Sequence, residues 1–149
     1  MGGHRVKILL RIVAAILVLI GGLLHYRIWD DRYRDIPDGA LPGLNVVKVG
    51  FPVNAGVSVL LAILLIVFGR RPIVWLVTLL FEVGSIVALV LSRQASIFGW
   101  EEKGWDSDAK QVLLVEVLAV VLLGLLLTFD FLRSGSGSGS DSDTDTDTA

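Results

Sequence analysis

Three ionisable residues stand inside long apolar stretches of the sequence, where they could handle a proton or a small cation. They are His25, Glu82 and Glu116. An ionised side chain at the centre of a membrane-spanning helix costs about 2.5–3.5 kcal/mol, so such residues need a structural or functional reason. Glu82 follows Pro72 by ten residues, about 15 Å along a helix, which puts it near the membrane midplane. Because no basic residue lies at its depth, we expect Glu82 to be protonated, either as a structural hydrogen-bond donor or as a proton or cation site.

Further polar residues share helical faces with these three. Ser85 lies three residues after Glu82, and Ser92 lies seven residues after Ser85, spacings that keep all three on one helical face. Most of these side chains fall in the half of the membrane nearer the two longer loops, so helices that turn these faces inward would gather them. The predicted intramembrane cluster consists of His25, Asn54, Glu82, Ser85, Ser92 and Glu116.

Plain helix packing explains part of the same pattern. Small and hydroxyl residues at four-residue spacing usually form contact surfaces between membrane helices. Glu116 also has two candidate partners that would only fasten the bundle, His25 and a loop arginine. The residues for which packing is the favoured role are Ala14, Gly21, Ser58, Ala62 and Thr78.

Aromatic and charged side chains collect in the two longer loops. Trp and Tyr favour the membrane interface, so anchoring is their favoured role and a ligand-stacking pocket is the alternative. The candidate loop residues are Tyr33, Arg34, Trp100 and Glu101. A further hypothesis has Arg34 reaching back to Glu116.

Four apolar stretches of about 20 residues, the length that spans a ~30 Å hydrocarbon core, must position these side chains. The 149-residue chain is 54% hydrophobic and 19% charged, whereas a soluble domain has about 45–50% apolar and about 25% charged residues. We predict helices over about residues 8–26, 51–69, 72–91 and 110–132. Pro52 is expected in the first turn of the second helix, where its missing N–H matters least.

The predicted fold class is therefore all-α, a four-helix transmembrane bundle with a disordered acidic C-terminal tail. The membrane domain covers residues 1–133. Residues 134–149 are Ser, Gly, Asp and Thr repeats, which have nothing to bury and should form a solvated tail.

Composition and motifs exclude several classes of site. Cysteine is absent, which excludes disulfides, thiol chemistry and cysteine-bound zinc. His4 lies in the N-terminal tail, so one chain cannot supply two membrane histidines to a haem. No nucleotide-binding or hydrolase motif is present, and no broad basic surface indicates a nucleic acid partner. We therefore expect no catalytic residue, no metal and no cofactor.

An even number of spans puts both termini on one side of the membrane. Raw counting of Lys and Arg does not decide which side, because six lie on the side of the termini, including the Arg70-Arg71 turn, and seven lie in the opposite loops. The flank of the first helix usually dominates orientation, and here it is basic without any acid. The short Arg70-Arg71 turn is also only basic. We expect cytoplasmic termini in a multi-pass protein of the cell membrane.

Scattered residue patterns give the chain a resemblance to a group of small actinobacterial four-helix membrane proteins. The resemblance covers roughly residues 8–130. The group has no assigned activity, so the resemblance implies the architecture and the polar cluster but no reaction. The patterns are His25-x3-Trp29, Tyr33-Arg34-Asp35-Ile36, Phe51-x2-Asn54-Ala55, Leu91-Ser92-Arg93, Phe98-Gly99-Trp100-Glu101, Trp105 and Val115-Glu116.

Three functions fit these observations. The favoured one is a non-enzymatic accessory or interaction subunit, partnered by the lipid bilayer and by another membrane protein or a second copy, because the loops of ~20 residues are too short for a domain. The second is a small transporter or channel component that uses Glu82 and Glu116. The third is a lipid-binding protein or membrane enzyme that uses His25 and Glu116, since a His–carboxylate pair can act as a general base.

Overall fold

The computed structural model describes residues 2–40, 43–95 and 104–135, and all regular structure among them is helical. Its elements are α1 (Gly2–Ile28), a π-helical turn η1 (Trp29–Tyr33), α2 (Leu44–Phe68), α3 (Pro72–Gln94) and α4 (Ser107–Gly135). All four α-helices are long and apolar enough to cross a membrane. The protein is therefore a four-helix transmembrane bundle, as predicted. Residues 136–149 of the predicted tail lie outside the described residues.

The prediction for the start of the second helix was wrong. α2 begins at Leu44 rather than near Phe51, and Pro52 lies inside the helix rather than in its first turn. An interior proline leaves one backbone hydrogen bond unmade, but tertiary contacts hold the earlier turns. Lys48 Nζ donates to the carbonyl of Ile36 at 2.6 Å and forms an ion pair with Asp38 at 2.7 Å.

The other predicted helices are longer in the structure than in the sequence analysis. α1 begins at Gly2 rather than near residue 8, and η1 continues it to Tyr33. α3 ends at Gln94 instead of Leu91, and α4 extends the predicted 110–132 segment at both ends. The extra turns are polar, so hydropathy gave no sign of them. These added turns lie at the two ends of the bundle.

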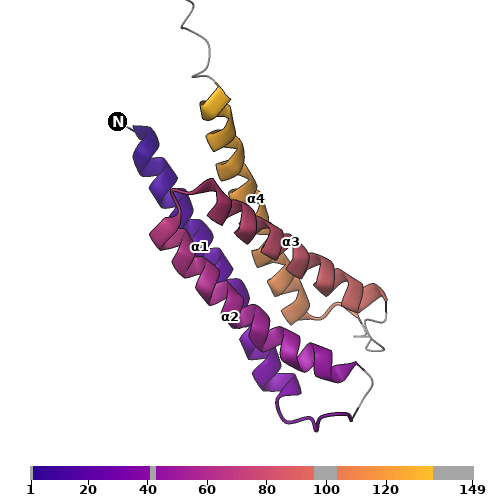
Figure 1. Cartoon of the computed structure of the whole chain (residues 1–149). Helices are drawn as coiled ribbons and strands as arrows, with labels where there is room; N and C mark the ends of the chain where they lie inside the picture. The colour runs from indigo at the N-terminus through magenta and orange to yellow at the C-terminus, as the bar shows by residue number, and fades with distance from the viewer. Residues whose placement is uncertain (1, 41–42, 96–103, 136–149) are drawn as a thin grey trace, which may run out of the picture.

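The helices make three extensive contacts, α1 with α2, α3 with α4 and α1 with α4, whereas α2 and α3 touch much less. Figure 1 shows α1 running beside α2, and the N-terminus at the same end of the bundle as the end of α4. The turn between Phe68 and Pro72 joins α2 to α3 at this end. Of the four neighbouring helix pairs in the described residues, α2 and α3 therefore form the least extensive contact.

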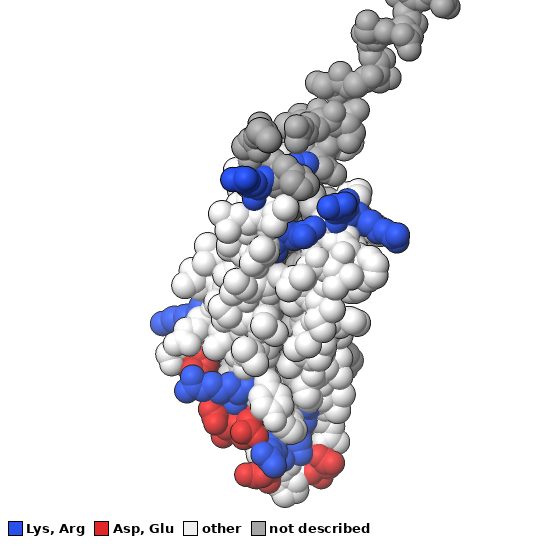
Figure 2. Space-filling model, turned by 90° about the vertical axis from the view of Figure 1, so that its left-hand side faces the viewer, with Lys and Arg blue, Asp and Glu red and all other residues white. Residues whose placement is uncertain are grey.

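Apolar side chains cover the outside of the bundle between two charged ends (Figure 2). In the part of the chain whose side chains are described, the end with the N-terminus carries Arg5, Lys7, Arg70 and Arg71, and the opposite end carries charges of both signs. A soluble protein would not leave so much large apolar surface exposed. The pattern is that of a multi-pass membrane protein.

Small residues set the distance between α1 and α2. The residues predicted to serve in packing, Ala14, Gly21, Ser58, Ala62 and Thr78, are all buried, which confirms that prediction. At Gly22 the helices come so close that an added Cβ would lie 2.6 Å from Cβ of Ser58 and 3.2 Å from the carbonyl oxygen of Ala55. Close approach at small residues is a common way for membrane helices to gain packing contacts.

Gly22→Ala is expected to lower the free energy of unfolding by about 1–3 kcal/mol, because the methyl group forces α1 and α2 apart. Gly56→Ala is the matched control, since a Cβ there meets nothing within 4 Å and the gain in helix propensity is the same at both sites. Unfolding by sodium dodecyl sulfate in mixed micelles measures both variants. Equal stability of the two would contradict the close packing at Gly22.

Candidate functional site

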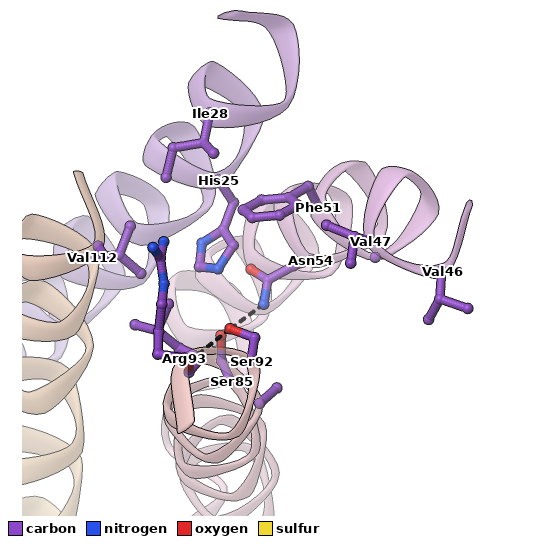
Figure 3. Close-up of a pocket in the computed structure, with 14 residues that line it drawn as sticks. His25, Ile28, Val46, Val47, Phe51, Asn54, Ser85, Ser92, Arg93 and Val112 are labelled. Carbon is purple, nitrogen blue, oxygen red and sulfur yellow. Dashed lines mark hydrogen bonds between the residues drawn. The ribbon is translucent and has the colours of Figure 1, made fainter. Parts of the chain in front are cut away.

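A pocket of about 220 Å³ lies at the end of the bundle opposite the termini, and all four helices line it (Figure 3). α1 and α4 form its floor with the buried side chains of His25, Ile28, Ala109 and Val112. The remaining lining residues come from α2 and α3: Val46, Val47, Gly50, Phe51, Asn54, Ser85, Ala88, Leu89, Ser92 and Arg93.

The exposed lining residues show where the pocket opens. Val46, Gly50 and Ala88 are exposed, and they lie on α2 and α3. The pocket therefore opens sideways through the weakly packed α2–α3 seam.

A chain of hydrogen bonds runs behind the pocket from α2 to α4. Asn54 Nδ2 donates to Ser85 Oγ at 2.9 Å, and Ser85 Oγ donates to Glu116 Oε1 at 2.5 Å. Ser58 Oγ extends the chain by donating to Asn54 Oδ1 at 3.4 Å. Each donor points the same way, so the chain ends on the Glu116 carboxyl, which is 2% exposed.

His25 approaches the same carboxyl from α1. Its Nε2 lies 3.7 Å from Glu116 Oε1, and its Nδ1 lies 2.9 Å from the carbonyl oxygen of Gly21. The other side of the ring contacts Phe51, with ring centroids 5.5 Å apart, and Phe51 stacks on the buried ring of Tyr33 at 5.3 Å. His25 thus forms part of the pocket wall and also touches the buried carboxyl.

Glu82 lies deeper in the bundle. It is 2% exposed and interacts electrostatically with Glu116. No hydrogen bond joins its carboxyl to another residue in the described part of the chain. A neutral Glu82 avoids burying an unpaired charge, in line with the expectation from its depth.

The structure brings four of the six predicted cluster residues, His25, Asn54, Ser85 and Glu116, into one connected group. Ser92 stands at the pocket and donates to the carbonyl oxygen of Leu89 at 2.7 Å. Glu82 shares the buried face of α3 but does not line the pocket.

Among the candidate loop residues, the hypothesis that Arg34 reaches Glu116 was wrong. Arg34 is exposed and donates to Asp30, one helical turn earlier, at 2.7 Å. Tyr33 is buried against Phe51 instead of anchoring at the interface. Trp100 and Glu101 lie outside the described residues.

Arg93 is a lining residue that the sequence analysis named in a pattern but did not place among the candidate site residues. Its side chain is 3% exposed, and its Nη1 donates to the carbonyl oxygen of Gly104 at 2.9 Å and lies 3.9 Å from Asp106 Oδ2. The predicted helix stopped at Leu91 and so left Arg93 in a loop. A longer α3 would have placed it beside Ser92, at the mouth of the cluster.

Asp106 fastens the loop end of the bundle. Its Oδ1 accepts from the backbone N–H of Ala109 at 2.8 Å, the N-cap arrangement for α4, and Arg32 donates to both Asp106 and Asp108 at 2.5 Å. Burial opposes the charged form of Asp106, but the Ala109 N–H and the Arg32 guanidinium outweigh it and lower its pKa. The contact joins η1 to the start of α4 beside the pocket.

Asp106→Ala is expected to cost about 0.5–2 kcal/mol of stability through the lost N-cap. Asp106→Asn keeps an N-cap acceptor but loses the charge, so it should cost less, within the ~0–1 kcal/mol typical of solvent-screened ion pairs. Unfolding of detergent-solubilised protein by circular dichroism gives both values.

The charge effect has a defined pH dependence. A lowered pKa stabilises the fold above the ordinary aspartate value of 3.8, and this stabilisation is lost as the pH falls through the lower folded-state value. The stability difference between the parent and Asp106→Asn should therefore shrink on acidification below about pH 4. If this stability difference stays constant with pH, the Arg32–Asp106 ion pair does not contribute to stability.

The group of His25, Ser85 and Glu116 can hold a proton, since it places an imidazole nitrogen 3.7 Å from a buried carboxyl oxygen and each of these two groups can bind one. In the described part of the chain, no group of three or more His, Cys, Asp or Glu side chains could hold a metal ion. No protein-family model matches the sequence, and no curated protein or solved structure matches it.

Proposed function

We propose that this membrane protein binds anionic phospholipid, with part of one acyl chain in the α2–α3 pocket and the head group beside Arg93. The lateral opening of the pocket carries the proposal. The surrounding medium at that opening is lipid, and the rim residues Val46, Gly50 and Ala88 present no charge to it.

The size of the pocket supports a partly inserted molecule. Sites that enclose a whole small molecule measure about 300–1,000 Å³, whereas this pocket measures about 220 Å³. Ser85 and Arg93, which lie toward its inner and outer ends, are eight residues apart, about 12 Å along a helix. A segment of acyl chain fits this length while the rest of the lipid stays in the bilayer.

The polar lining favours an anionic head group. Arg93 brings a positive charge to the pocket near the end of α3, and His25 adds a ring that can become charged. A guanidinium can bind a phosphate through paired N–H donors. Asn54 and Ser85 lie farther in and are hydrogen-bonded to each other. An apolar acyl chain beside them therefore does not deprive these two polar groups of their partner.

Gly50→Leu tests the proposal by filling the rim of the pocket. Gly56→Leu is the matched control, because both glycines lie exposed on α2 and an added Cβ at either meets nothing within 4 Å, while Gly56 does not line the pocket. Native mass spectrometry after gentle extraction counts retained phosphatidylglycerol. We expect at least about tenfold less in Gly50→Leu, equivalent to about 1.4 kcal/mol. Equal retention in the two variants would refute lipid binding in this pocket.

We also propose cytoplasmic termini in the cell membrane. The support is the basic end of the bundle, where Arg5, Lys7, Arg70 and Arg71 stand on the side of the N-terminus, since basic flanks favour the cytoplasmic side.

Single cysteines test this orientation without background, because the chain has none. With a membrane-impermeant maleimide, Ala40→Cys in the exposed first loop should react in intact cells. Gly3→Cys should react only after the membrane is opened. The reverse pattern would invert the proposed topology.

The expectations of an accessory subunit, of a membrane-protein partner or second copy, and of membership in the actinobacterial group stay predictions. Lipid binding takes precedence among the three functions of the sequence analysis because the structure supplies a pocket for it. The transporter alternative gains a specific observation in the proton chemistry of Glu116.

A further inference from the structure

We infer that His25 and Glu116 form a proton-binding site behind the pocket, and that proton uptake there strengthens binding of the anionic lipid. This inference rests on the proposed function for its second half. The proton site itself stands on the contacts among α1, α3 and α4.

The hydrogen bond of His25 fixes where its proton sits. A carbonyl oxygen can only accept, so the 2.9 Å contact with Gly21 requires a hydrogen on Nδ1. In a neutral ring Nε2 then carries the lone pair, and this is the nitrogen that lies 3.7 Å from Glu116 Oε1. The basic atom of His25 therefore faces the buried carboxyl.

The two carboxyl oxygens of Glu116 have different surroundings, and Oε2 is the one that can carry a proton. Oε1 accepts from Ser85 at 2.5 Å. Oε2 is buried and has no hydrogen-bond partner within the described residues. A buried carboxylate oxygen without a partner is costly, and a proton on it removes the charge. The pair thus holds one proton without net charge, either on Glu116 or on His25 Nε2.

A second proton makes the pair cationic. The proton comes from a hydronium ion, whose O–H bond breaks to leave water, and an N–H bond forms at His25 Nε2 while Glu116 keeps its O–H. His25 then places a positive charge on the pocket wall. Unlike Glu116, it lines the pocket, so the charge of the pair reaches the bound molecule through this ring.

The charged and titratable groups around the pair come mainly from α3. Glu82 interacts electrostatically with Glu116, and Arg93 shares the pocket wall with His25 (Figure 3). From the start of α4, Asp106 Oδ2 lies 3.9 Å from Arg93 Nη1 and balances part of its charge. α2 faces the pair with the neutral Asn54 and Phe51, and Tyr33 stacks on the Phe51 ring.

Arg93 provides the link between proton and lipid. Two positive groups in one pocket repel each other, and an anionic head group between them relieves the repulsion. Lipid therefore favours the doubly protonated pair, and by reciprocity the proton favours lipid.

Nitrogen-15 NMR of the histidine rings tests the inference, because the chain has only His4 and His25. His25→Gln assigns the signals, and His4, on the N-terminal side of the bundle, is the internal control. In wild-type protein we expect the His25 signal to change with pH in lipid-free detergent. In Glu116→Gln the one-proton state with its proton on His25 Nε2 loses the carboxylate that stabilises it, so the His25 transition should move to lower pH by about one unit or more, while His4 stays unchanged. A His25 signal that ignores pH, or one that Glu116→Gln leaves unaltered, would overturn the proton site.

The coupling is tested on the wild-type fold in nanodiscs with and without phosphatidylglycerol. We expect anionic lipid to move the His25 transition to higher pH in the parent and in Gly56→Leu, and not in Gly50→Leu, where the pocket is filled. Equal shifts in both glycine variants would overturn the coupling, since a general surface effect would then explain them. If Gly50→Leu also retains normal lipid, the proposed function fails, while the detergent titration still decides the proton site.

Discussion

The hydrogen bond from Ser85 to Glu116 joins α3 to α4 at a depth where the bilayer offers no replacement partner. A buried carboxyl inside a membrane bundle must be satisfied by the protein or neutralised. Here the Ser85 hydroxyl and the His25 imidazole meet it from α3 and α1, and the Asn54 amide of α2 donates to Ser85 behind them. The orientation of those helices about their axes follows, because each must turn its polar residue toward Glu116.

Packing around this group is uneven, and the pocket is the consequence. Small residues let α1 approach α2 closely at Gly22, and an apolar core joins all four helices through residues such as Ala14, Leu61, Trp75 and Leu123. α2 and α3 contact each other much less than the neighbouring helix pairs do. The pocket lies along the seam between them, which the Asn54–Ser85 hydrogen bond crosses.

The loop end of the bundle is closed by charged contacts in addition to an apolar cluster around Tyr33, Leu44 and Val112. Arg32, Asp106 and Asp108 tie the turn after α1 to the start of α4, and Arg93 joins the same region from α3. These contacts fix the outer end of the pocket between η1, α3 and the start of α4. The opposite end, on the side of the N-terminus, carries Arg5, Lys7, Arg70 and Arg71.

The sequence by itself determined the class, the number of spans and the buried polar residues. Hydropathy decides those because a hydrocarbon core admits only long apolar helices, and an acid such as Glu116 within one stands out. The sequence did not determine that α2 starts at Leu44, since its first turns are held by Lys48 and loop contacts that hydropathy does not register. Nor did it give the partner of Arg34 or the position of Arg93 at the pocket. Only the tertiary structure decided which helices pack closely and which leave a seam, because that depends on how side chains from separate helices fit together in space.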